Sequence, residues 1–276
     1  MALKLMYITN SPEVAKIAEE SGVDRIFIDL EYIGKSDRQG GMDTVQSHHT
    51  LEDIKRIKNS LTTAKLLVRV NPIHDATEKY PSTEYEIDTA IKNGAEILML
   101  PYFKKADEVK RFISAVNRRA KTMLLIETPQ AVENIDEILQ VPGIDFIHIG
   151  LNDLSLGYKM KFMFELLTDG TVERLCKKFK ESNIEYGFGG IAALGKGAIP
   201  AEMVIKEHYR LGSSCAILSR SFCNTDKVRS IDAIRSTFIN GMKEIRNFEA
   251  ECLMHRKFFT DNTEILKEKV KNIVNN

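Results

Sequence analysis

The sequence predicts an α/β protein, a single (β/α)8 TIM barrel followed by a C-terminal helical extension. Short apolar runs alternate with longer amphipathic stretches along the chain, which is typical of repeated strand–helix units in a parallel sheet. The runs are apolar throughout, as expected of strands that are buried on both faces. Eight such runs in 276 residues favour a closed barrel over an open doubly wound sheet, since one barrel takes about 250 residues.

Eight strands are expected at the apolar runs. In chain order they cover Leu3–Ile8, Arg25–Asp29, Leu66–Val70, Glu96–Leu100, Thr122–Ile126, Phe146–Ile149, Tyr186–Ile191 and Cys215–Leu218. The first helix begins at Ser11 and Pro12, because serine can cap a helix and proline is tolerated in its first turn. It ends at Gly22, and a later helix ends at Gly94, since glycine is common just past a helix. No G-x-G-x-x-G motif follows a strand, which argues against a dinucleotide-binding fold.

The barrel is expected to span residues 1–248 and the helical extension residues 249–276. A helical pattern over Ile231–Met242 can supply the eighth outer helix. The extension carries an apolar helical face made of Phe258, Phe259, Leu266, Val270 and Ile273. An isolated helix this short is marginal in water, so this face must be buried against the barrel of the same chain or against a neighbouring subunit.

Composition excludes several classes of protein. Lys plus Arg and Asp plus Glu are both 39, so the formal net charge is zero and the basic excess typical of a nucleic-acid binder is not found. The apolar runs are far shorter than the roughly 20 residues of a membrane span, and the N-terminus turns polar too soon for a signal peptide. The four cysteines lack zinc-site spacing. We therefore expect a cytoplasmic protein with free thiols that binds neither nucleic acid nor a membrane.

Polar side chains follow the apolar runs at their C-terminal ends, where barrels of this kind place the active site. Asp29 and Glu31 close the second strand and Arg69 the third, while Glu127 follows the fifth and Asp153 the sixth. Carboxyl groups that converge on one rim are costly to bury unless a cation compensates them. Their oxygens suit Mg²⁺ or Mn²⁺, with waters and substrate completing the coordination shell. The rim is therefore a candidate divalent-metal site.

These charged residues also have structural interpretations. Asp153 could cap the helix that follows it. Capping is a poorer explanation for Glu127, because a Thr-Pro pair follows it at once. Arg69 could be the ion-pair partner of Asp29 or Glu31.

The histidines near the rim have structural interpretations too. His148 alternates with apolar neighbours and is expected in the core or behind the site. His48 and His49 lie on one long irregular stretch, Tyr32–Thr50, where surface exposure is the default. Loops of this length are nevertheless often functional or disordered.

Five segments resemble the hydroxy-oxo-acid aldolase / citrate lyase β-subunit family. They are Phe27–Glu31, Arg69–Pro72, Leu100–Pro101, Ile126–Asn134 and Ile149–Ser155, in the right order over residues 3–222. The Arg-Val-Asn-Pro segment is similar to the citrate lyase side of the family. The Glu-Thr and Gly-x-Asn-Asp-Leu-Ser segments are similar to the pyruvate aldolase side.

The resemblance implies a (β/α)8 barrel that cleaves carbon–carbon bonds with Mg²⁺, or with Mn²⁺ or Co²⁺. By resemblance, Glu127 and Asp153 are the metal ligands, and Arg69, Asn152 and Asp153 bind a keto-acid substrate. Arg69 is also catalytic in this comparison, since it and the metal would stabilise the enolate formed as the bond breaks. The last helix of such barrels is often exchanged between subunits. We therefore expect a homo-oligomer whose C-terminal helices pack on a neighbour.

The sequence departs from the family pattern at the proton-transfer machinery. The pyruvate aldolases carry a histidine directly after the Asp-x-Glu segment, where Tyr32 stands here. The aspartate that assists that histidine is matched by Lys92, and a glutamine before the metal-binding glutamate is matched by Leu125. His48, His49 or a metal-bound hydroxide could replace the missing group, and His49 is our candidate catalytic residue.

The sequence therefore predicts a metal-dependent carbon–carbon lyase that forms or consumes pyruvate or a similar keto acid. Two other functions remain open. A lyase acting on a CoA thioester, as in the citrate lyase β type, would need a basic nucleotide-binding rim. A barrel that binds a keto acid and a metal without turnover would account for the missing histidine.

Overall fold

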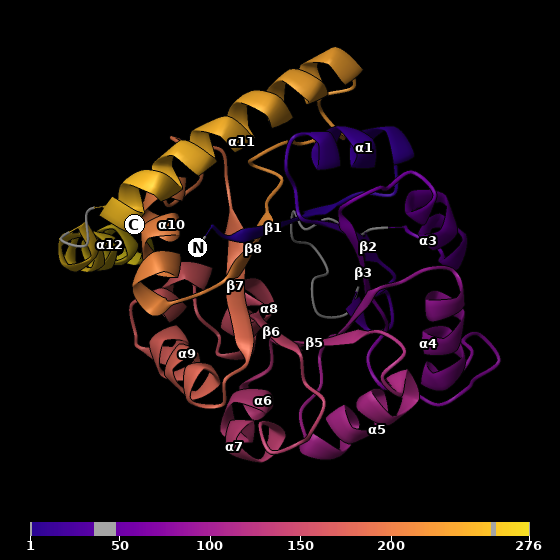
Figure 1. Ribbon diagram of the computed structural model, residues 1–276. Helices are drawn as coiled ribbons and strands as arrows, with labels where there is room; N and C mark the ends of the chain where they lie inside the picture. Colours follow the sequence, from indigo (N-terminus) through magenta and orange to yellow (C-terminus); the bar gives the residue numbers. More distant parts are fainter. Residues whose placement is uncertain (1, 36–47, 255–257, 276) are drawn as a thin grey trace.

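The computed structural model describes residues 2–35, 48–254 and 258–275, apart from the side chain of residue 258. Within these residues eight parallel strands close into one barrel (Figure 1). The strands are β1 (Lys4–Ile8), β2 (Arg25–Asp29), β3 (Lys65–Arg69), β4 (Ile97–Leu100), β5 (Lys121–Ile126), β6 (Phe146–Ile149), β7 (Glu185–Ile191) and β8 (Cys215–Leu218). Each strand pairs with the next one along the chain, and β8 pairs with β1. The predicted barrel is confirmed, and each strand begins and ends within one residue of its expected bounds.

Helices surround the barrel and connect successive strands (Figure 1). They are α1 (Pro12–Glu20), α3 (Leu51–Lys58), α4 (Thr83–Lys92), α5 (Ala106–Val116), α6 (Pro129–Glu133), α7 (Ile135–Ile138), α8 (Leu151–Gly157), the 3-10 helix Met163–Leu167, α9 (Thr171–Glu181), α10 (Ala201–Leu211), α11 (Ile231–Met254) and α12 (Phe258–Asn275). The predicted cap of α1 is present, because the Ser11 hydroxyl accepts a hydrogen bond from the Val14 N–H at 3.4 Å. Gly22 follows α1 with a φ of 93°, a value that glycine adopts without strain.

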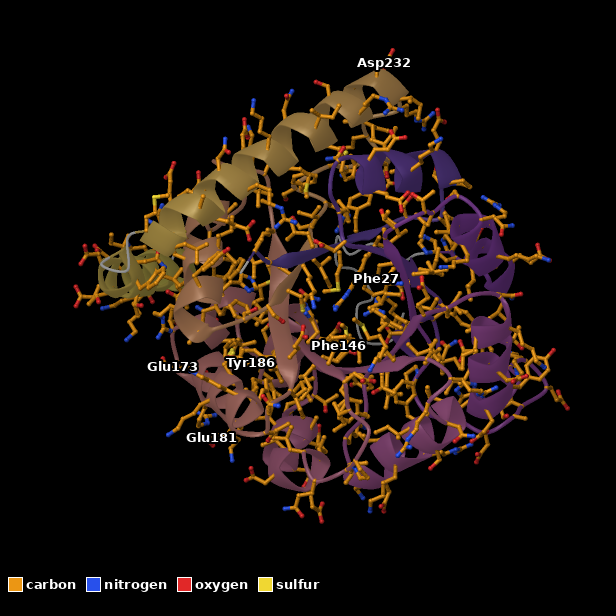
Figure 2. The ribbon with its side chains drawn as sticks, viewed as in Figure 1. Phe27, Phe146, Glu173, Glu181, Tyr186 and Asp232 are labelled. Carbon is orange, nitrogen blue, oxygen red and sulfur yellow. The ribbon has the colours of Figure 1, made fainter. Side chains whose placement is uncertain are left out.

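Two apolar layers hold the barrel together. One fills its interior with side chains from the strands, among them Phe27, Leu67 and Met123. The other lies between the strands and the outer helices. Figure 2 places Phe27 and Phe146 inside the ring of strands, whereas Glu173 and Asp232 project from the outer helices. A solid interior leaves the strand ends as the place where polar side chains can meet.

The C-terminal helices pack on their own chain. The helix predicted over Ile231–Met242 continues to Met254, so the proposed domain boundary at residue 248 falls inside α11. Beyond it, α12 lies beside α10 (Figure 1). Leu266 and Val270 on α12 are 1% and 3% exposed, and Asn262 donates a hydrogen bond to the buried Glu207 of α10 at 2.9 Å. α10 of the same chain therefore covers Leu266 and Val270, whereas Ile273 on the same predicted face is 39% exposed, and packing of the C-terminal helices on a neighbouring subunit stays a prediction.

Other expectations from composition can be compared with the structure. All four cysteines are free, as predicted, and all are also buried: Cys176, Cys215, Cys223 and Cys252. Among the described helices, none has the length and apolar character to cross a membrane. The long stretch Tyr32–Thr50 is described only at its two ends, since residues 36–47 lie outside the described part of the chain.

Candidate active site at the barrel mouth

Two adjoining cavities open at the C-terminal ends of the strands. The first, which we call the Glu127 cavity, has a volume of about 200 Å³ and is lined by Arg69, Glu127, Asn152 and Asp153. The second, which we call the Asn10 cavity, measures about 460 Å³ and is lined by His49 and again by Arg69. Four of the five predicted site residues therefore lie around one cavity, and the fifth lies around its neighbour.

Beside these cavities, two carboxylates and two cations form a buried cluster. Arg69 donates from Nε and Nη2 to the two carboxylate oxygens of Asp29, both at 2.8 Å. Lys35 Nζ donates to Asp29 Oδ2 at 2.8 Å and lies 3.7 Å from Glu31 Oε2. Arg69 Nη1 lies 3.3 Å from the same Glu31 oxygen. The structural interpretation of Arg69 as an ion-pair partner is confirmed for both carboxylates.

The cluster balances its own charge. Burial by itself would raise the pKa of the Asp29 carboxyl, but Arg69 and Lys35 outweigh burial and hold that pKa well below its usual range. Burial would likewise lower the pKa of Arg69, and Asp29 and Glu31 keep it well above its ordinary value instead. Asp29 and Arg69 thus stay charged as a pair, and Lys35 and Glu31 are their second partners in the cluster. Asp29 and Glu31 are therefore neutralised by side chains and do not need a metal ion.

Sequence reasoning missed Lys35. The sequence did contain a signal for it. Asp29 and Glu31 close one strand and Arg69 closes the next, so two carboxylates near one arginine indicate that a second cation lies close to them. Lys35 stands four residues after Glu31. It follows the second strand too distantly to have been read as a strand-end residue.

Glu127 is held in place by backbone groups. Its side chain is 2% exposed, and its Oε1 accepts a hydrogen bond from the Tyr102 N–H at 2.9 Å. Tyr102 has a φ of 50°, a left-handed conformation that non-glycine residues seldom adopt and that is often found at functional sites. A Cβ on Gly150 would lie 3.0 Å from Glu127 Oε2, so a larger residue here would press on the Glu127 side chain.

Asp153 lies in the first turn of α8, but it does not cap that helix. The N-cap position is Gly150, and the capping interpretation of Asp153 is therefore wrong. Glu127 is not a capping residue either, since Thr128 Oγ1 accepts from the Ala131 N–H and caps α6. In the described ranges, no group of three or more His, Cys, Asp or Glu side chains is placed to hold a metal ion. A metal in the Glu127 cavity would therefore have two carboxylate ligands from the protein.

His49 is partly buried and lies in the wall of the Asn10 cavity. Its Nδ1 accepts a hydrogen bond from the Asp29 N–H at 3.0 Å. Burial lowers the pKa of His49 below the ordinary 6.5. A ring whose Nδ1 accepts must carry its hydrogen on Nε2, so His49 is uncharged and has one N–H to donate. Exposure was expected for both loop histidines; this is right for His48 and wrong for His49.

Of the remaining candidates, His148 also lines the Glu127 cavity, whereas Tyr32 and Lys92 do not. His148 is fully buried, its Nε2 lies 3.0 Å from the Gly189 carbonyl oxygen, and burial lowers its pKa to about 4. The prediction of a core histidine is confirmed. Tyr32 is 48% exposed, with its ring centroid 5.5 Å from that of Tyr80. Lys92 pairs with Asp88 on the surface. Neither Tyr32 nor Lys92 reaches the Glu127 cavity.

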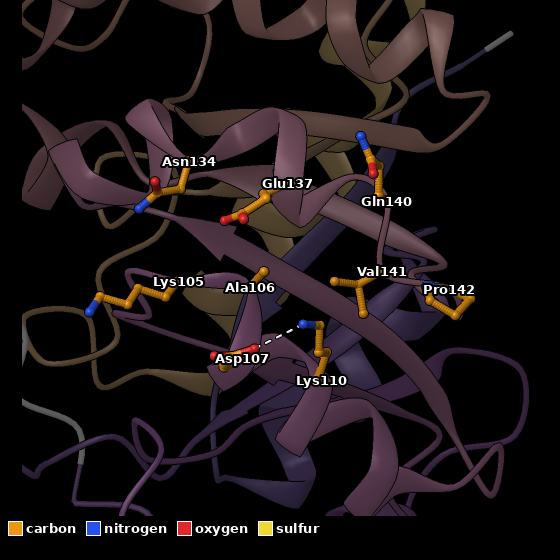
Figure 3. A pocket seen from close by; sticks show the side chains of 9 residues that line it. All are labelled: Lys105, Ala106, Asp107, Lys110, Asn134, Glu137, Gln140, Val141 and Pro142. Atoms are coloured by element: carbon orange, nitrogen blue, oxygen red, sulfur yellow. Dashed lines mark hydrogen bonds and ion pairs between the residues drawn. The ribbon is translucent and has the colours of Figure 1, made fainter.

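A larger cavity lies outside the barrel, between α5 and α7 (Figure 3). Its volume is about 610 Å³, and no strand end contributes to it. The charged groups Asp107 and Lys110 in its wall pair with each other at 2.8 Å. This groove lies away from the strand ends that bear the predicted site residues.

Comparisons with known proteins agree with the barrel fold. Two curated relatives are the 2-keto-3-deoxy-L-rhamnonate aldolases of Klebsiella pneumoniae subsp. pneumoniae, 27% identical over 166 residues, and Escherichia coli K12, 26% identical over 159 residues. The matches cover 54% and 52% of this chain and 60% and 58% of those relatives, so the chain spans about three fifths of their length. An HpcH/HpaI aldolase structure from Desulfitobacterium hafniense has a TM-score of 0.62 at 17% identity, covering 85% of this chain and 93% of that one. A structure of an HpcH/HpaI aldolase/citrate lyase family protein from Burkholderia cenocepacia has a TM-score of 0.62 at 13% identity, and the match covers 85% of this chain and 95% of that one.

The match to a family model is more specific than these similarities of fold. The model of the HpcH/HpaI aldolase/citrate lyase family matches residues 4–174, which is more than half of the chain. That range runs from β1 into α9 and includes the strand ends that bear Arg69, Glu127 and Asp153. The chain belongs to the HpcH/HpaI aldolase/citrate lyase family.

Proposed function

We propose that this chain is a metal-dependent carbon–carbon lyase of the aldolase type. It would cleave or form a hydroxy-oxo acid, with pyruvate or a similar keto acid as one of the two fragments. The observation that carries this proposal is the Glu127 cavity, which brings Arg69, Glu127 and Asp153 together at the strand ends. Membership of the family and the aldolase names of the two relatives support it.

Glu127 and Asp153 would hold a divalent cation. Their oxygens fit Mg²⁺ as the first candidate, with Mn²⁺ or Co²⁺ as alternatives, because Mg²⁺ usually takes one or two carboxylates and keeps several waters. The remaining positions would be open to the oxygens of a keto acid. When bound, the cation supplies positive charge that stabilises negative charge on those oxygens. A divalent metal is also in keeping with the family.

Arg69 would bind a keto-acid oxygen and stabilise the enolate that remains when the carbon–carbon bond breaks. A guanidinium carries five N–H donors, and Asp29 uses two of them. The other donors are available to Glu31 and to a substrate. The two bonds to Asp29 fix the plane of the guanidinium, so its orientation does not have to be established during the reaction. Asn152 and Asp153 would complete the wall against the substrate.

His49 would act as a neutral hydrogen-bond donor in this reaction. Its Nδ1 lone pair is occupied by the Asp29 N–H, which leaves no lone pair for a general base. Its Nε2–H can donate to the oxygen of the hydroxyl-bearing carbon and stabilise the charge that develops there. A neutral imidazole polarises substrate oxygens in this way in other barrel enzymes.

Two substitutions at His49 test that role. A glutamine side chain can present an N–H near the place of Nε2, so H49Q should retain most of the activity. An asparagine side chain is shorter and can only imitate the Nδ1 acceptor, so H49N should lose about 100-fold in kcat, the typical loss when one such donor is removed. Steady-state rates from pH 5 to 8 measure both.

For the native protein we expect a constant rate above pH 6.5 and a decline only below the ordinary histidine range, because burial lowers the pKa of His49. Equal loss in both variants would point to proton transfer.

Pyruvate release tests the reaction as a whole. A panel of hydroxy-oxo acids is supplied with Mg²⁺, Mn²⁺ or Co²⁺, and release should require both the protein and the metal. Tight binding of keto acid and metal without turnover would identify a binding protein instead. The CoA-thioester reaction would need a basic nucleotide-binding rim, and two of the cations described there, Arg69 and Lys35, pair with Asp29 and Glu31.

We also expect a homo-oligomer. Of the eight large exposed hydrophobic side chains in the described part of the chain, five lie on α11 and α12, namely Ile239, Leu253, Met254, Ile265 and Ile273. Apolar groups gathered on one part of a surface are typical of protein contacts. Light scattering should give a mass above 31.3 kDa for the full chain, and L253E together with I265E should shift it to the monomer. A full chain that runs as a monomer contradicts this prediction.

A further inference from the structure

We infer that Asn71 and Glu86 are positioning residues for Arg69, and this inference rests on the proposed function. Asn71 lies two residues after Arg69, just beyond the end of β3, and Glu86 lies on α4. Neither side chain is in the wall of the Glu127 cavity. Their hydrogen bonds reach Arg69 through the segment that follows β2. Asn71 and Glu86 would therefore orient the guanidinium without touching the substrate.

Glu86 is a carboxylate at a position that a helix ordinarily gives to an apolar side chain. The buried stripe of α4 consists of Thr83, Glu86, Ile87 and Ala90, at the spacing of a helix face turned to the core. Glu86 is 4% exposed, and burial raises the pKa of its carboxyl. Burying a charge is costly unless hydrogen bonds compensate it. A glutamate at this position therefore indicates a specific partner.

That partner is Asn71, whose side chain is 2% exposed. Its Nδ2 donates to Glu86 Oε1 at 2.9 Å, and its backbone nitrogen lies 3.3 Å from both carboxylate oxygens. Every hydrogen bond to the Glu86 carboxylate in the described part of the chain comes from Asn71. Because Nδ2 is held by Glu86, the direction of the amide oxygen of Asn71 is fixed as well.

That amide oxygen holds the chain as it leaves β2. Asn71 Oδ1 accepts hydrogen bonds from the N–H groups of Tyr32 and Ile33, both at 3.0 Å. The chain then turns, since the Lys35 N–H donates to the Tyr32 carbonyl oxygen at 3.2 Å. Two consecutive N–H groups on one acceptor fix the start of this turn. Asn71 therefore determines where Lys35 begins.

Lys35 completes the connection to Arg69. Its Nζ lies 2.8 Å from Asp29 Oδ2 and 3.7 Å from Glu31 Oε2, and Arg69 contacts the same two carboxylates. If the turn opened, Lys35 would leave both of them to one arginine, and the guanidinium would be drawn toward the charge that has lost its partner. A displacement of about 1 Å can cost about 100-fold in rate when a group must be aligned with a reacting oxygen.

N71S tests this connection. Serine is too short to hold Glu86 and the two N–H groups together, and it adds no charge. We expect kcat for pyruvate release to fall by about 10-fold with little change in KM, because Arg69 keeps its charge and loses its alignment. In the R69K background the guanidinium plane is already lost, so N71S should cost less than about 3-fold there. A residue that only stabilises the fold would cost the same factor in both backgrounds.

Two further variants accompany N71S. E86A removes the acceptor that fixes Asn71 and should give the same pattern of losses. It should also fold, because it removes a buried charge and adds none. N134S is the matched control, since Asn134 likewise donates from Nδ2, to the Lys104 carbonyl oxygen at 2.9 Å, on the outer side of the barrel. It should leave kcat unchanged. Thermal melting identifies the folded variants, and either N71S or E86A is sufficient.

An exchange of charge between the two residues tests the pair itself. N71D keeps an acceptor for the N–H groups of Tyr32 and Ile33, but it places two carboxylates at the 2.9 Å now spanned by a hydrogen bond. It should lose at least as much kcat as N71S. Adding E86Q restores one amide and one carboxylate to the pair. N71D/E86Q should therefore recover at least about 5-fold in kcat over N71D, as expected only of side chains that meet.

The Nε–H resonance of Arg69 gives a measurement that needs no turnover. Nε donates to Asp29 at 2.8 Å, and the signal is assigned by its absence from R69K. N71S and E86A should shift or broaden this signal in nitrogen-15 spectra, whereas N134S should leave it unchanged.

An unchanged resonance, equal losses of kcat in the native and R69K backgrounds, or no recovery in a folded N71D/E86Q overturns the inference. A native protein that releases no pyruvate refutes the proposed function instead. The shifted resonance would then still show that Asn71 and Glu86 orient Arg69.

Discussion

E127Q and D153N are each expected to raise the dissociation constant for Mn²⁺ by at least about 100-fold. Replacing a residue that only hydrogen-bonds to a metal ligand already weakens metal binding by about 10- to 100-fold, and these substitutions change the ligands themselves. Each substitution removes one of the two carboxylates in the Glu127 cavity and leaves the shape of the side chain nearly unchanged. Isothermal titration calorimetry with Mn²⁺ measures the effect. E137Q and D107N, in the outer groove between α5 and α7, are the matched controls and should bind as the native protein does.

Thermal stability gives a second measurement of the same site. A ligand at 100 times its dissociation constant stabilises the folded state by about 2.7 kcal/mol, so Mn²⁺ should raise the melting temperature of the native protein. E127Q and D153N should lose this increase. The metal-free variants should remain as stable as the metal-free native protein. Each substitution leaves one negative charge instead of two in the Glu127 cavity, and without a metal those two like charges disfavour each other. Native affinity in both variants would refute the assignment of the metal ligands.

The fold could be predicted well because local sequence patterns indicate each strand of the barrel. Each strand is a continuous apolar run, and each is bounded by residues that begin or end helices. The C-terminal part was harder to predict. The apolar face of α12 requires a partner, but only the spatial position of α10 shows that Leu266 and Val270 meet their own chain.

The part of the candidate site that lies at the strand ends could be predicted from the sequence. Arg69, Glu127 and Asp153 come together because parallel strands in a closed barrel end on one rim. Contacts made by loops could not be predicted in that way. The pairing of Lys35 with Asp29, and the bond from the Asp29 N–H to His49, depend on the path of the chain after β2. Periodicity carries no information about that path.

R69K should reduce kcat by about 100-fold or more while preserving most of the stability. Lysine keeps the positive charge beside Asp29 and Glu31, but it cannot make the two parallel hydrogen bonds that fix the guanidinium plane. Losing one oriented donor to a developing oxyanion costs about 100- to 1,000-fold. R111K is the matched control, because Arg111 makes a similar two-bond contact with Glu84 on the surface. Pyruvate release under saturating substrate measures kcat, and a normal kcat with a raised KM would limit Arg69 to binding.

R69M separates the charge of Arg69 from its geometry. It leaves two buried carboxylates with Lys35 as their one remaining cation in the cluster, and breaking a buried pair in this way costs about 3–5 kcal/mol. In the native protein, Arg69 and Lys35 outweigh burial and hold the pKa of Asp29 low. The Asp29–Arg69 pair therefore stabilises the fold above about pH 3.9, the ordinary pKa of an aspartate in the unfolded chain, and this stabilisation is lost as the pH falls further. Without Arg69 the pKa of Asp29 rises, and Asp29 becomes neutral at a higher pH. The difference in unfolding free energy between native protein and R69M should therefore shrink between pH 7 and pH 4, as urea denaturation at each pH can measure. A difference that stays constant over this range would show that the Asp29–Arg69 pair does not govern the stability of the barrel mouth.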